Sequence, residues 1–431
     1  MHEYNFIDLF AGCGGLSLGL VNAGFKGVFA VEKTEDAFKT LKYNLCDKRK
    51  SFKWPDWLPC ENMTTDDLLT KYKEHLKTLE NKVFLIAGGP PCQGFSFAGL
   101  RNPKDPRNRL TEEYIEIVSI IKPKVLLLEN VRGFQVAFKN TTKKPYSEKV
   151  KETLEKKGYK VFKNIISAAE FGVPQLRHRF IMIAIREDCL SDFLNNAKDE
   201  TILKLILNTA QKHKKTLGLK KQVTVGDAIS DLELTGKSQI DCVDCKGFSQ
   251  LQYKAPDKLN PYLKIMRKGI KKSEMPNSLR LAKHKEHTLQ RYEYILKHAE
   301  KGCAVNCKIK EKVNFKKHCL SVLSADKISN TITTIPEDTL HYKEARILTA
   351  RETARIQSFP DWFEFQGRYT TGGPRRKYEC PRYTQIGNAV PPLMAETLGR
   401  FIINLAESEL CYEWNRTNKF FNSRKTKRYY W

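Results

Sequence analysis

The chain has 431 residues, of which 41% are hydrophobic and 29% are charged, so it is long enough for two domains and is not a disordered polypeptide. Its net charge of +26 favours a polyanionic partner, most simply nucleic acid. Its apolar runs are too short for a membrane span, and its first residues are not typical of a signal peptide. The 12 cysteines therefore predict reduced thiols in a cytoplasmic protein with no membrane partner.

The first half of the chain alternates apolar runs with amphipathic segments. Buried strands are predicted at residues 4–10, 27–31, 83–87, 125–128, 161–166 and 180–185, with amphipathic helices such as 112–121 and 146–156 between them. This alternation predicts an α/β fold with a doubly wound, mostly parallel sheet over residues 1–186.

The pattern changes after residue 187, where Lys-rich stretches at 198–221 and 251–320 show no clear period. We expect a second, smaller and irregular basic domain over residues 187–382. Helical spacing returns at 346–356, and residues 385–410 are typical of a turn followed by a long helix. Residues 383–431 would then complete the first domain.

A glycine-rich turn follows the first predicted strand, in FIDLFAGCGGLSLGL at residues 6–20. Gly12, Gly14 and Gly15 allow the backbone to turn sharply and to approach a ligand closely. Glu32 follows about twenty residues later, where a carboxylate can bind a ribose diol. The pattern lacks the full dinucleotide fingerprint, but it predicts a site for a nucleoside-bearing cofactor. The alternative is a tight turn and a surface Glu.

Cys92 stands in GGPPCQGFS, just past the predicted strand 83–87. Ligands bind at this carboxyl edge in a parallel sheet. Prolines fix the approach to the thiol and Gly94 frees the chain beyond it, so we interpret Cys92 as a nucleophile, which requires the thiolate form. The alternative is a buried structural cysteine.

Further polar groups are predicted at the same sheet edge. Glu129 ends the strand in VLLLENV, and Arg177 and Arg179 precede the strand at 180–185. A protonated carboxyl can donate to a ring nitrogen, and a guanidinium can hold a carbonyl oxygen or a phosphate. The sequence thus brings a thiol, a carboxyl and a guanidinium to one edge.

With these residues the chain resembles the DNA (cytosine-5)-methyltransferases, in particular the bacterial type II restriction–modification enzymes. The matching segments occur in the family's order over nearly the whole chain: FIDLFAGCGGLSLGL, Glu32, GGPPCQGFSFAG, DPRNRL at 105–110, ENV at 129–131, QLRHR at 175–179, RILTARETARIQSFPDWF at 346–363 and QIGNAVPP at 385–392.

The resemblance implies transfer of a methyl group from S-adenosyl-L-methionine to C5 of a cytosine in duplex DNA. Cys92 would attack C6 covalently, Glu129 would hydrogen-bond or protonate N3, and Arg177 or Arg179 would stabilise O2. The base must flip out of the duplex, and Gln93 or a residue between 97 and 109 would fill the gap. A cognate restriction endonuclease as functional partner, a monomer and a bacterial cytoplasm are expected.

The cofactor-binding residues are carried over from the same motifs. They are Phe10, Ala11, Gly12, Gly14, Gly15, Leu16, Glu32, Asn62, Met63, Pro90, Asn388 and Ala389. The family often places an acidic residue at the adenine edge, where this chain has Asn62 in ENMTTDD. The Asn carbonyl can accept from an amine, but Asp66 or Asp67 is an open alternative.

In the resembled family, the region between QxRxR and the closing motifs reads the DNA target, which corresponds here to residues 187–345, with SNTITT at 329–334 as its structured end. Cys242 and Cys245, with Cys303 and Cys307 further along, have zinc-like spacing, although we expect unrelated thiols and no metal. Alternative functions are a tRNA cytosine-5 methyltransferase and an inactive regulator on the same fold.

Overall fold

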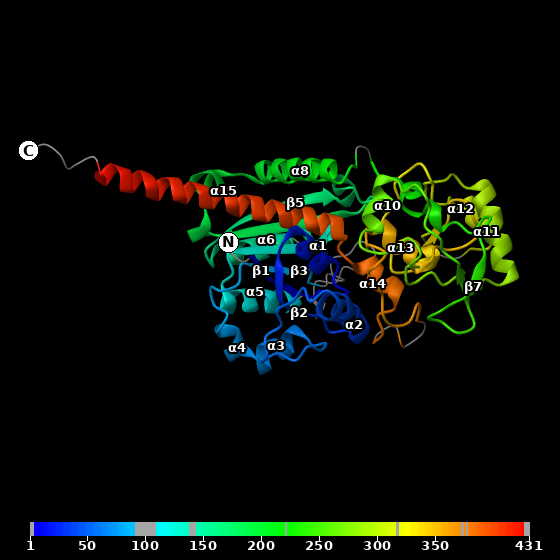
Figure 1. The fold of residues 1–431 in the computed structure, drawn as a ribbon, viewed down its shortest axis with the longest axis horizontal. Coiled ribbons are helices and arrows are strands. Elements are labelled where there is room, and N and C mark those ends of the chain that lie inside the picture. Colours follow the sequence, from blue (N-terminus) through cyan, green and yellow to red (C-terminus); the bar gives the residue numbers. More distant parts are fainter. Residues whose placement is uncertain are drawn as a thin grey trace, which may run out of the picture.

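The computed structural model describes residues 4–90, 109–137, 144–219, 222–315, 319–371, 375 and 378–425, with side chains as far as residue 408. Figure 1 shows a sheet flanked by helices at one end of the molecule and a second, less regular domain at the other. Within the described ranges, no helix is both long enough and apolar enough to cross a membrane.

All six predicted strands are confirmed, and they form one sheet in the order β2-β1-β3-β4-β6-β5. The strands are β1 (Asn5–Leu9), β2 (Lys26–Val31), β3 (Leu85–Gly88), β4 (Val125–Val131), β5 (Tyr159–Ser167) and β6 (His178–Arg186). Only β6 pairs antiparallel with its neighbours β4 and β5. The predicted mostly parallel sheet is therefore confirmed.

Helices cover both faces of this sheet, as a doubly wound fold requires. One face carries α1 (Gly15–Ala23), α8 (Asp199–Thr216) and α15 (Pro392–Lys425), and the other carries α3 (Thr65–Lys71), α4 (Lys73–Lys77), α5 (Arg109–Ile121) and α6 (Tyr146–Glu155). After β2 the chain forms α2 (Glu35–Leu41) and the π-helix η1 (Lys42–Lys48).

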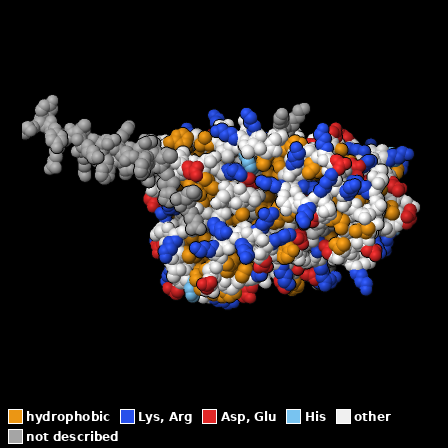
Figure 2. Space-filling model, viewed as in Figure 1, with side chains coloured by type: hydrophobic (Ala, Val, Ile, Leu, Met, Phe, Trp, Pro, Cys, Tyr) orange, Lys and Arg blue, Asp and Glu red, His pale blue; other side chains and the backbone are white. Residues whose placement is uncertain are grey.

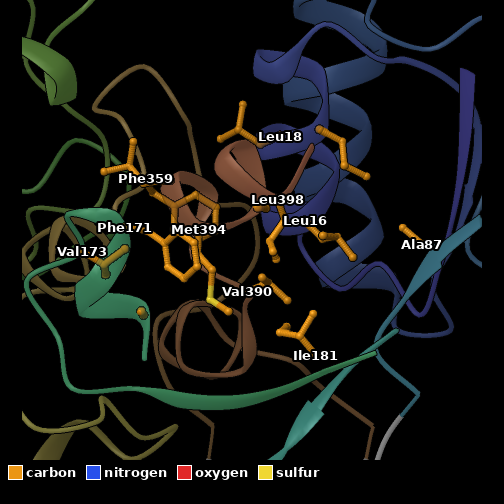
Figure 3. Packing of buried hydrophobic residues seen from close by; sticks show 14 of the residues in the cluster. Leu16, Leu18, Ala87, Phe171, Val173, Ile181, Phe359, Val390, Met394 and Leu398 are labelled. Carbon is orange, nitrogen blue, oxygen red and sulfur yellow. The ribbon is translucent and has the colours of Figure 1, made fainter. Parts of the chain in front are cut away.

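Glycines let α1 and α15 approach closely although they lie nearly four hundred residues apart. A Cβ on Gly19 would lie 2.3 Å from the Cβ of Ala395, and one on Gly15 would lie 2.4 Å from the carbonyl oxygen of Val390. Leu16, Met394 and Leu398 complete the core here (Figure 3). This contact returns the C-terminal part of the chain to the helices that cover the sheet.

The second domain consists of short elements joined by long connections. They are α9 (Val225–Ile229), β7 (Gln239–Asp241), β8 (Ser249–Leu251), α10 (Pro261–Met266), α11 (Glu286–His298), α12 (Cys307–Lys312), β9 (Ser321–Val322) and β10 (Thr339–Leu340). Helices α13 (Ala350–Ile356) and α14 (Arg382–Asn388) lead back to α15. The predicted helix over 346–356 therefore starts later, at the N-cap Thr349, whose hydroxyl accepts from the Glu352 N–H.

Helix α8 departs from the expected absence of a period in residues 198–221. Ile202, Ile206, Ala210 and His213 are buried on one side of it, at spacings of four, four and three residues. The Asp199 carboxylate accepts from the Lys163 N–H in β5, and α8 packs against β5 and α15. We therefore propose that the second domain begins after α8 rather than at residue 187.

Buried ion pairs join α13 to earlier parts of the second domain. The Arg355 guanidinium is fully buried, donates to both oxygens of Asp361 at 2.8 and 2.7 Å, and donates to Asp231 at 2.5 Å. Asp361 also accepts from Arg267, which follows α10, at 3.2 Å. Three segments far apart in sequence thus converge on two carboxylates.

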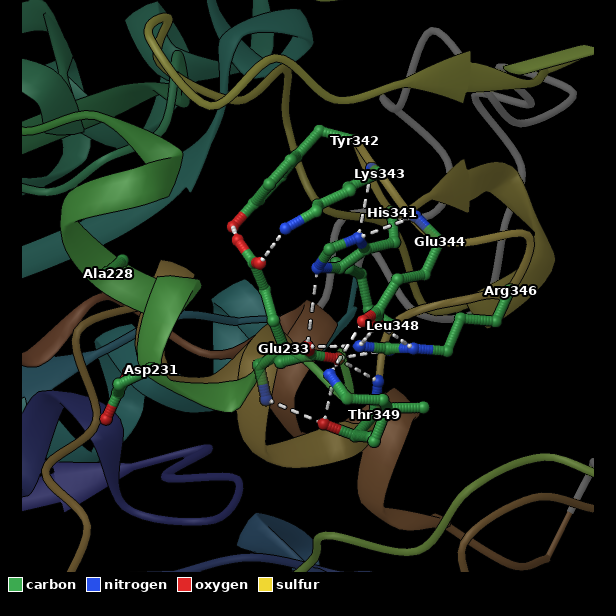
Figure 4. Close-up of polar contacts among 12 residues, drawn as sticks. Ala228, Asp231, Glu233, His341, Tyr342, Lys343, Glu344, Arg346, Leu348 and Thr349 are labelled. Carbon is green, nitrogen blue, oxygen red and sulfur yellow. Dashed lines mark hydrogen bonds and ion pairs between the residues drawn. The ribbon is translucent and has the colours of Figure 1, made fainter. Parts of the chain in front are cut away.

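A second buried cluster surrounds Glu352, and Figure 4 shows its neighbours Arg346, His341 and Thr349. Its carboxylate accepts two bonds of 2.8 Å from Arg346 and bonds from the backbone and hydroxyl of Thr349. Burial alone would raise the pKa of Glu352, but the charge and hydrogen bonds of Arg346, with help from His341 and Thr349, lower it to about 2.

We expect Gly19→Ala to lower the free energy of unfolding by about 1–3 kcal/mol. The added methyl group would also meet the backbone of Glu396 at 2.6 Å, which outweighs the better helix propensity of Ala. Urea unfolding measures the change. Asn22→Ala, at an exposed position of α1, should alter stability by less than about 0.5 kcal/mol. Equal stability of Gly19→Ala and the parent would contradict the close packing.

The lowered pKa of Glu352 predicts acid sensitivity. The ionised group stabilises the fold above its unfolded pKa of about 4.3, and about 3 kcal/mol is lost as the pH falls from there towards 2. Urea unfolding between pH 7 and pH 3 should show a shallower pH dependence for Glu352→Gln than for the parent. Glu35→Gln, in an exposed pair with Lys39, serves as the control and should keep the parent's slope. Parallel curves for the Glu352 variant and the parent would disprove the assignment.

Candidate active site

The glycine turn after β1 adopts the conformation that its sequence allows. Phe10, Gly12 and Gly14 have φ angles of 61°, 56° and 91°. All three lie in the left-handed region that favours glycine, and Phe10 adopts it although it carries a side chain. The Ala11 N–H donates to the Val31 carbonyl at 2.9 Å, which ties the turn to the end of β2. A Cβ on Gly12 would meet nothing within 4 Å, so the backbone there faces open space.

Glu32 lies against this turn, as predicted. Its Oε2 accepts from the Gly12 N–H at 3.0 Å, and its Oε1 accepts from the Thr34 N–H at 2.8 Å and from the Thr34 hydroxyl. A carboxylate oxygen has two lone pairs, so Oε2 keeps one acceptor position for a hydroxyl group from a ligand.

The chain between β2 and α3 brings Asn62 and Met63 beside Glu32. The Met63 N–H donates to the Glu32 carbonyl at 2.9 Å, and the Asn62 amide donates to the Lys33 carbonyl at 3.0 Å. Asn62 is exposed, and its side-chain carbonyl accepts no hydrogen bond from the described residues, so it can accept from a ligand amine.

Asp66 and Asp67 have other partners. Asp67 forms the capping box of α3 with Thr64 and pairs with Lys71 at 2.7 Å. Lys71 and Thr64 lower its pKa to about 2. Asp66 pairs with Arg109 at 2.8 Å. These contacts favour Asn62 over both alternatives at the cofactor edge.

The closing motif QIGNAVPP lies on the glycine turn. Ala389 Cβ would lie 3.3 Å from a Cβ on Gly15, and the Gln385 carbonyl accepts from the Cys13 thiol at 3.6 Å. Asn388 ends α14 and is exposed, whereas Leu16 is buried behind the turn. The turn, Glu32, Asn62 and Asn388–Ala389 are therefore gathered from four separate parts of the chain.

Glu129 and Asn130 lie near the end of β4, next to the segment that leads to Cys92. The Asn130 amide donates to the Pro90 carbonyl at 3.2 Å, and a Cβ on Gly89 would lie 3.1 Å from Glu129 Oε2. Cys92 itself lies outside the described residues, as does the stretch from Gln93 to residue 108.

Arg179 is the cation that meets Glu129. Its Nε lies 2.8 Å from Glu129 Oε1, and the two side chains are 12% and 13% exposed, so a small part of the pair is accessible to a ligand. In the antiparallel pairing of β4 with β6, Val131 lies opposite Arg179. The pair lies one strand away from the Gly89–Pro90 segment.

Arg177 has different partners although it is only two residues away. Its guanidinium is 2% exposed and donates to the Ile332 carbonyl at 3.2 Å and to the Gly387 carbonyl at 2.8 Å. Burial, followed by the charge of Arg179, lowers its pKa well below the ordinary value. Arg177 therefore joins the strand edge to the SNTITT segment and to the closing motif.

Gln175 completes this junction. Its side-chain carbonyl accepts from the Ile332 N–H at 2.9 Å, and its amide donates to the Gln357 side chain at 2.8 Å. A Cβ on Gly387 would lie 2.5 Å from the Thr333 carbonyl, so only glycine permits this approach. SNTITT therefore packs against QLRHR and the closing motif.

Two residues near the cofactor turn were missed by the sequence reasoning. Asp8 is fully buried in β1, and its Oδ2 accepts from the Ser17 hydroxyl at 2.5 Å. Burial raises its pKa to about 7, and its Oδ1 has no hydrogen-bond partner among the described residues. Cys380 lies beside Thr34 and Glu32. The signal for Asp8 was a carboxylate within an otherwise apolar strand, whereas Cys380 has no local signal.

The cysteine pairs of the second domain do not form a metal centre in the described part of the chain, where no group of three or more His, Cys, Asp or Glu residues could hold an ion. The Cys242 thiol donates instead to Asp244 at 3.2 Å.

Lys and Arg side chains are spread over both domains on the face shown in Figure 2, which suits a polyanionic ligand.

Comparison with known proteins gives a consistent result. The family model for C-5 cytosine-specific DNA methylases matches residues 4–404. Type II methyltransferase M.DdeI of Desulfomicrobium norvegicum is 30% identical over 408 residues, which cover 92% of this chain and 88% of the relative. Type II methyltransferase M.PspPI of Psychrobacter sp. is 33% identical over 409 residues, with coverage of 94% and 80%.

Solved structures agree on the fold. A prophage-encoded protein of E. coli has a TM-score of 0.64 at 23% identity, over 94% of this chain and 100% of that chain. The Dnmt2 methyltransferase of S. pombe has a TM-score of 0.51 at 15% identity, over 95% of this chain and 99% of that chain.

Proposed function

Because the chain belongs to the C-5 cytosine-specific DNA methylases, we propose that it is the modification enzyme of a type II restriction–modification system. It would methylate one cytosine within a short duplex sequence and so protect the DNA from a cognate endonuclease. We further propose that it works as a monomer in the cytoplasm. The observation that carries the assignment of residues is the Glu129–Arg179 pair beside the Gly89–Pro90 segment.

The residues around the glycine turn fit S-adenosyl-L-methionine, which supplies an electrophilic methyl group when bound. Glu32 Oε2 would accept from a ribose hydroxyl, and the open space at Gly12 leaves room for the ligand next to the backbone. The Asn62 carbonyl would accept from the adenine amine. Phe10, Ala11, Leu16, Met63, Pro90, Asn388 and Ala389 would complete the walls of the site.

Cys92 would supply the nucleophile. Its thiolate adds to C6 of the flipped cytosine, which makes C5 electron-rich enough to accept the methyl group. Loss of the C5 proton then expels the thiolate and restores the aromatic ring. The anchoring of Pro90 by Asn130 would hold the approach to this thiol beside Glu129.

Glu129 and Arg179 would bind the polar edge of the base together. A proton held between the Glu129 carboxyl and N3 withdraws electrons from the ring during the attack on C6. Arg179 keeps the carboxyl oriented through its Nε and has further N–H groups to donate to O2. Arg177, whose guanidinium donates to two backbone carbonyls, would position this edge without contacting the base.

The test is bisulfite sequencing of DNA from a methyl-free host that expresses the chain. Protected cytosines should recur within one short sequence, and Cys92→Ala should abolish protection while the protein still folds and binds S-adenosyl-L-methionine. Cys307→Ala, at an exposed cysteine, is the matched control and should protect like the parent. If bisulfite converted every cytosine in DNA from the host that expresses the parent, and the parent methylated tRNA instead, the substrate would be RNA rather than duplex DNA.

The two arginines should respond differently to replacement by Lys. Arg179→Lys should reduce kcat by about 100-fold with little change in stability, because a preorganised donor is lost. Arg177→Lys should lower the free energy of unfolding by about 1–3 kcal/mol, because one ammonium cannot serve both carbonyls. Steady-state kinetics and urea unfolding on both variants separate the roles. The reverse pattern would exchange the assignments.

A further inference from the structure

Two buried side chains of the first domain bind the backbone of residues 362–367, a second-domain segment that follows α13. They are Thr40 in α2 and Asn44 in η1, and both are fully buried. The Asn44 side-chain carbonyl accepts from the Glu364 N–H at 2.9 Å, and its amide donates to the carbonyls of Glu364 and Thr40 at 2.8 and 2.7 Å. Glu364 thus makes both backbone hydrogen bonds with one side chain, as paired residues of neighbouring β-strands do with each other.

Thr40 lies where three segments meet. Its hydroxyl accepts from the Gln366 N–H at 2.8 Å and donates to the side-chain carbonyl of Gln385 at 2.7 Å, which is closer than the Asp36 carbonyl at 3.2 Å. The Gln385 amide donates in turn to the carbonyls of Gln366 and Cys380 at 3.0 and 2.8 Å. Gln385 belongs to the closing motif QIGNAVPP. One buried hydroxyl therefore joins α2, the 362–367 segment and the closing motif.

The same two helices also support the glycine turn. A Cβ on Gly14 would lie 3.1 Å from Leu41 Cγ and 3.2 Å from Leu45 Cδ1, and these leucines directly follow Thr40 and Asn44. Figure 1 shows α2 beside α14, which carries Gln385. The element η1 is a π-helix, a rare form that occurs frequently at functional sites. Helices α2 and η1 thus contact the glycine turn through one set of side chains and the second domain through another.

We propose that Thr40 and Asn44 are positioning residues that hold the second domain in register with the cofactor site. The effect on DNA rests on the proposed function, in which the second domain reads the target while Cys92 and Glu129 act from the first domain. The duplex must then contact both domains at once, and misplacement by about 1 Å is enough to impair such a reaction. The two side chains bind protein backbone and Gln385 rather than a ligand, so they act through the domain arrangement.

This role predicts a specific kinetic signature. If the contacts at 364 and 366 are lost, the aligned arrangement of the domains is populated only part of the time, and the KM for DNA rises by the inverse of that fraction. Saturating DNA selects the aligned arrangement, so kcat is retained. A residue that served only stability would instead reduce the amount of folded enzyme, which lowers kcat and leaves the KM unchanged.

The test compares variants of the full chain on a duplex that carries the methylated sequence. Thr40→Val, which removes the hydroxyl, should raise the KM for DNA about tenfold while kcat and the Kd for S-adenosyl-L-methionine stay within about twofold of the parent. Hydrogen exchange should be faster in the peptide that contains the Gln366 N–H. Thr40→Ser keeps the hydroxyl and should restore the parent values.

Asn44→Ala should give the same kinetic pattern, with faster exchange at Glu364. Lys48→Gln is the matched control, because it removes a partly exposed ion pair of 2.8 Å with the Glu364 side chain and leaves the backbone contacts intact. It should behave like the parent. If Asn44→Ala failed to fold, Thr40→Val and Thr40→Ser would still decide the proposal.

Two results would overturn the proposal: a KM for DNA that stays at the parent value in Thr40→Val, or a loss of kcat with the KM unchanged. If the parent methylated no DNA, the proposed function would be wrong, and hydrogen exchange at Glu364 and Gln366 would still decide whether the two side chains hold the second-domain segment. The two failures are therefore distinguishable.

Discussion

The burial of Arg355 between Asp231 and Asp361 holds separate parts of the second domain together, and the site depends on the segment that continues from this cluster. Each of the three groups would be costly to bury alone, and removal of one member of such a pair typically costs about 3–5 kcal/mol. Arg351 of the same helix donates to carbonyls of Asn277, Pro360 and Phe363. Helix α13 is thus held on several sides by charges that the sequence alone would place on a surface.

A continuous series of buried polar contacts leads from α13 to the proposed catalytic edge. Gln357 follows α13 and accepts from Gln175, and Arg177 binds the carbonyls of Ile332 and Gly387. Arg179, two residues further along, meets Glu129. The basic domain and the chemical groups are therefore positioned by the same short segment, so a displacement of one is expected to move the other.

The cofactor side depends on close backbone contacts rather than on charge. Gly19 admits α15 against α1, and Gly15 admits Ala389 and Val390 against the glycine turn. The η1 helix supports the other side of the turn through Leu45. Since neither support contains a catalytic group, both can transmit changes to the cofactor site without taking part in the chemistry.

The sequence by itself determined the six strands, the glycine turn with Glu32, and the strand-end position of Glu129, because strand periodicity and glycine geometry are local properties. It did not reveal α8, whose buried residues follow one another at intervals of four, four and three positions within a Lys-rich stretch. It also left Arg177 and Arg179 equivalent and Asp67 open as a cofactor ligand. Only the tertiary structure gives these residues their different partners, such as Gly387 for Arg177 and Lys71 for Asp67. Most of those partners come from distant segments, and local spacing carries no information about which of those segments meet.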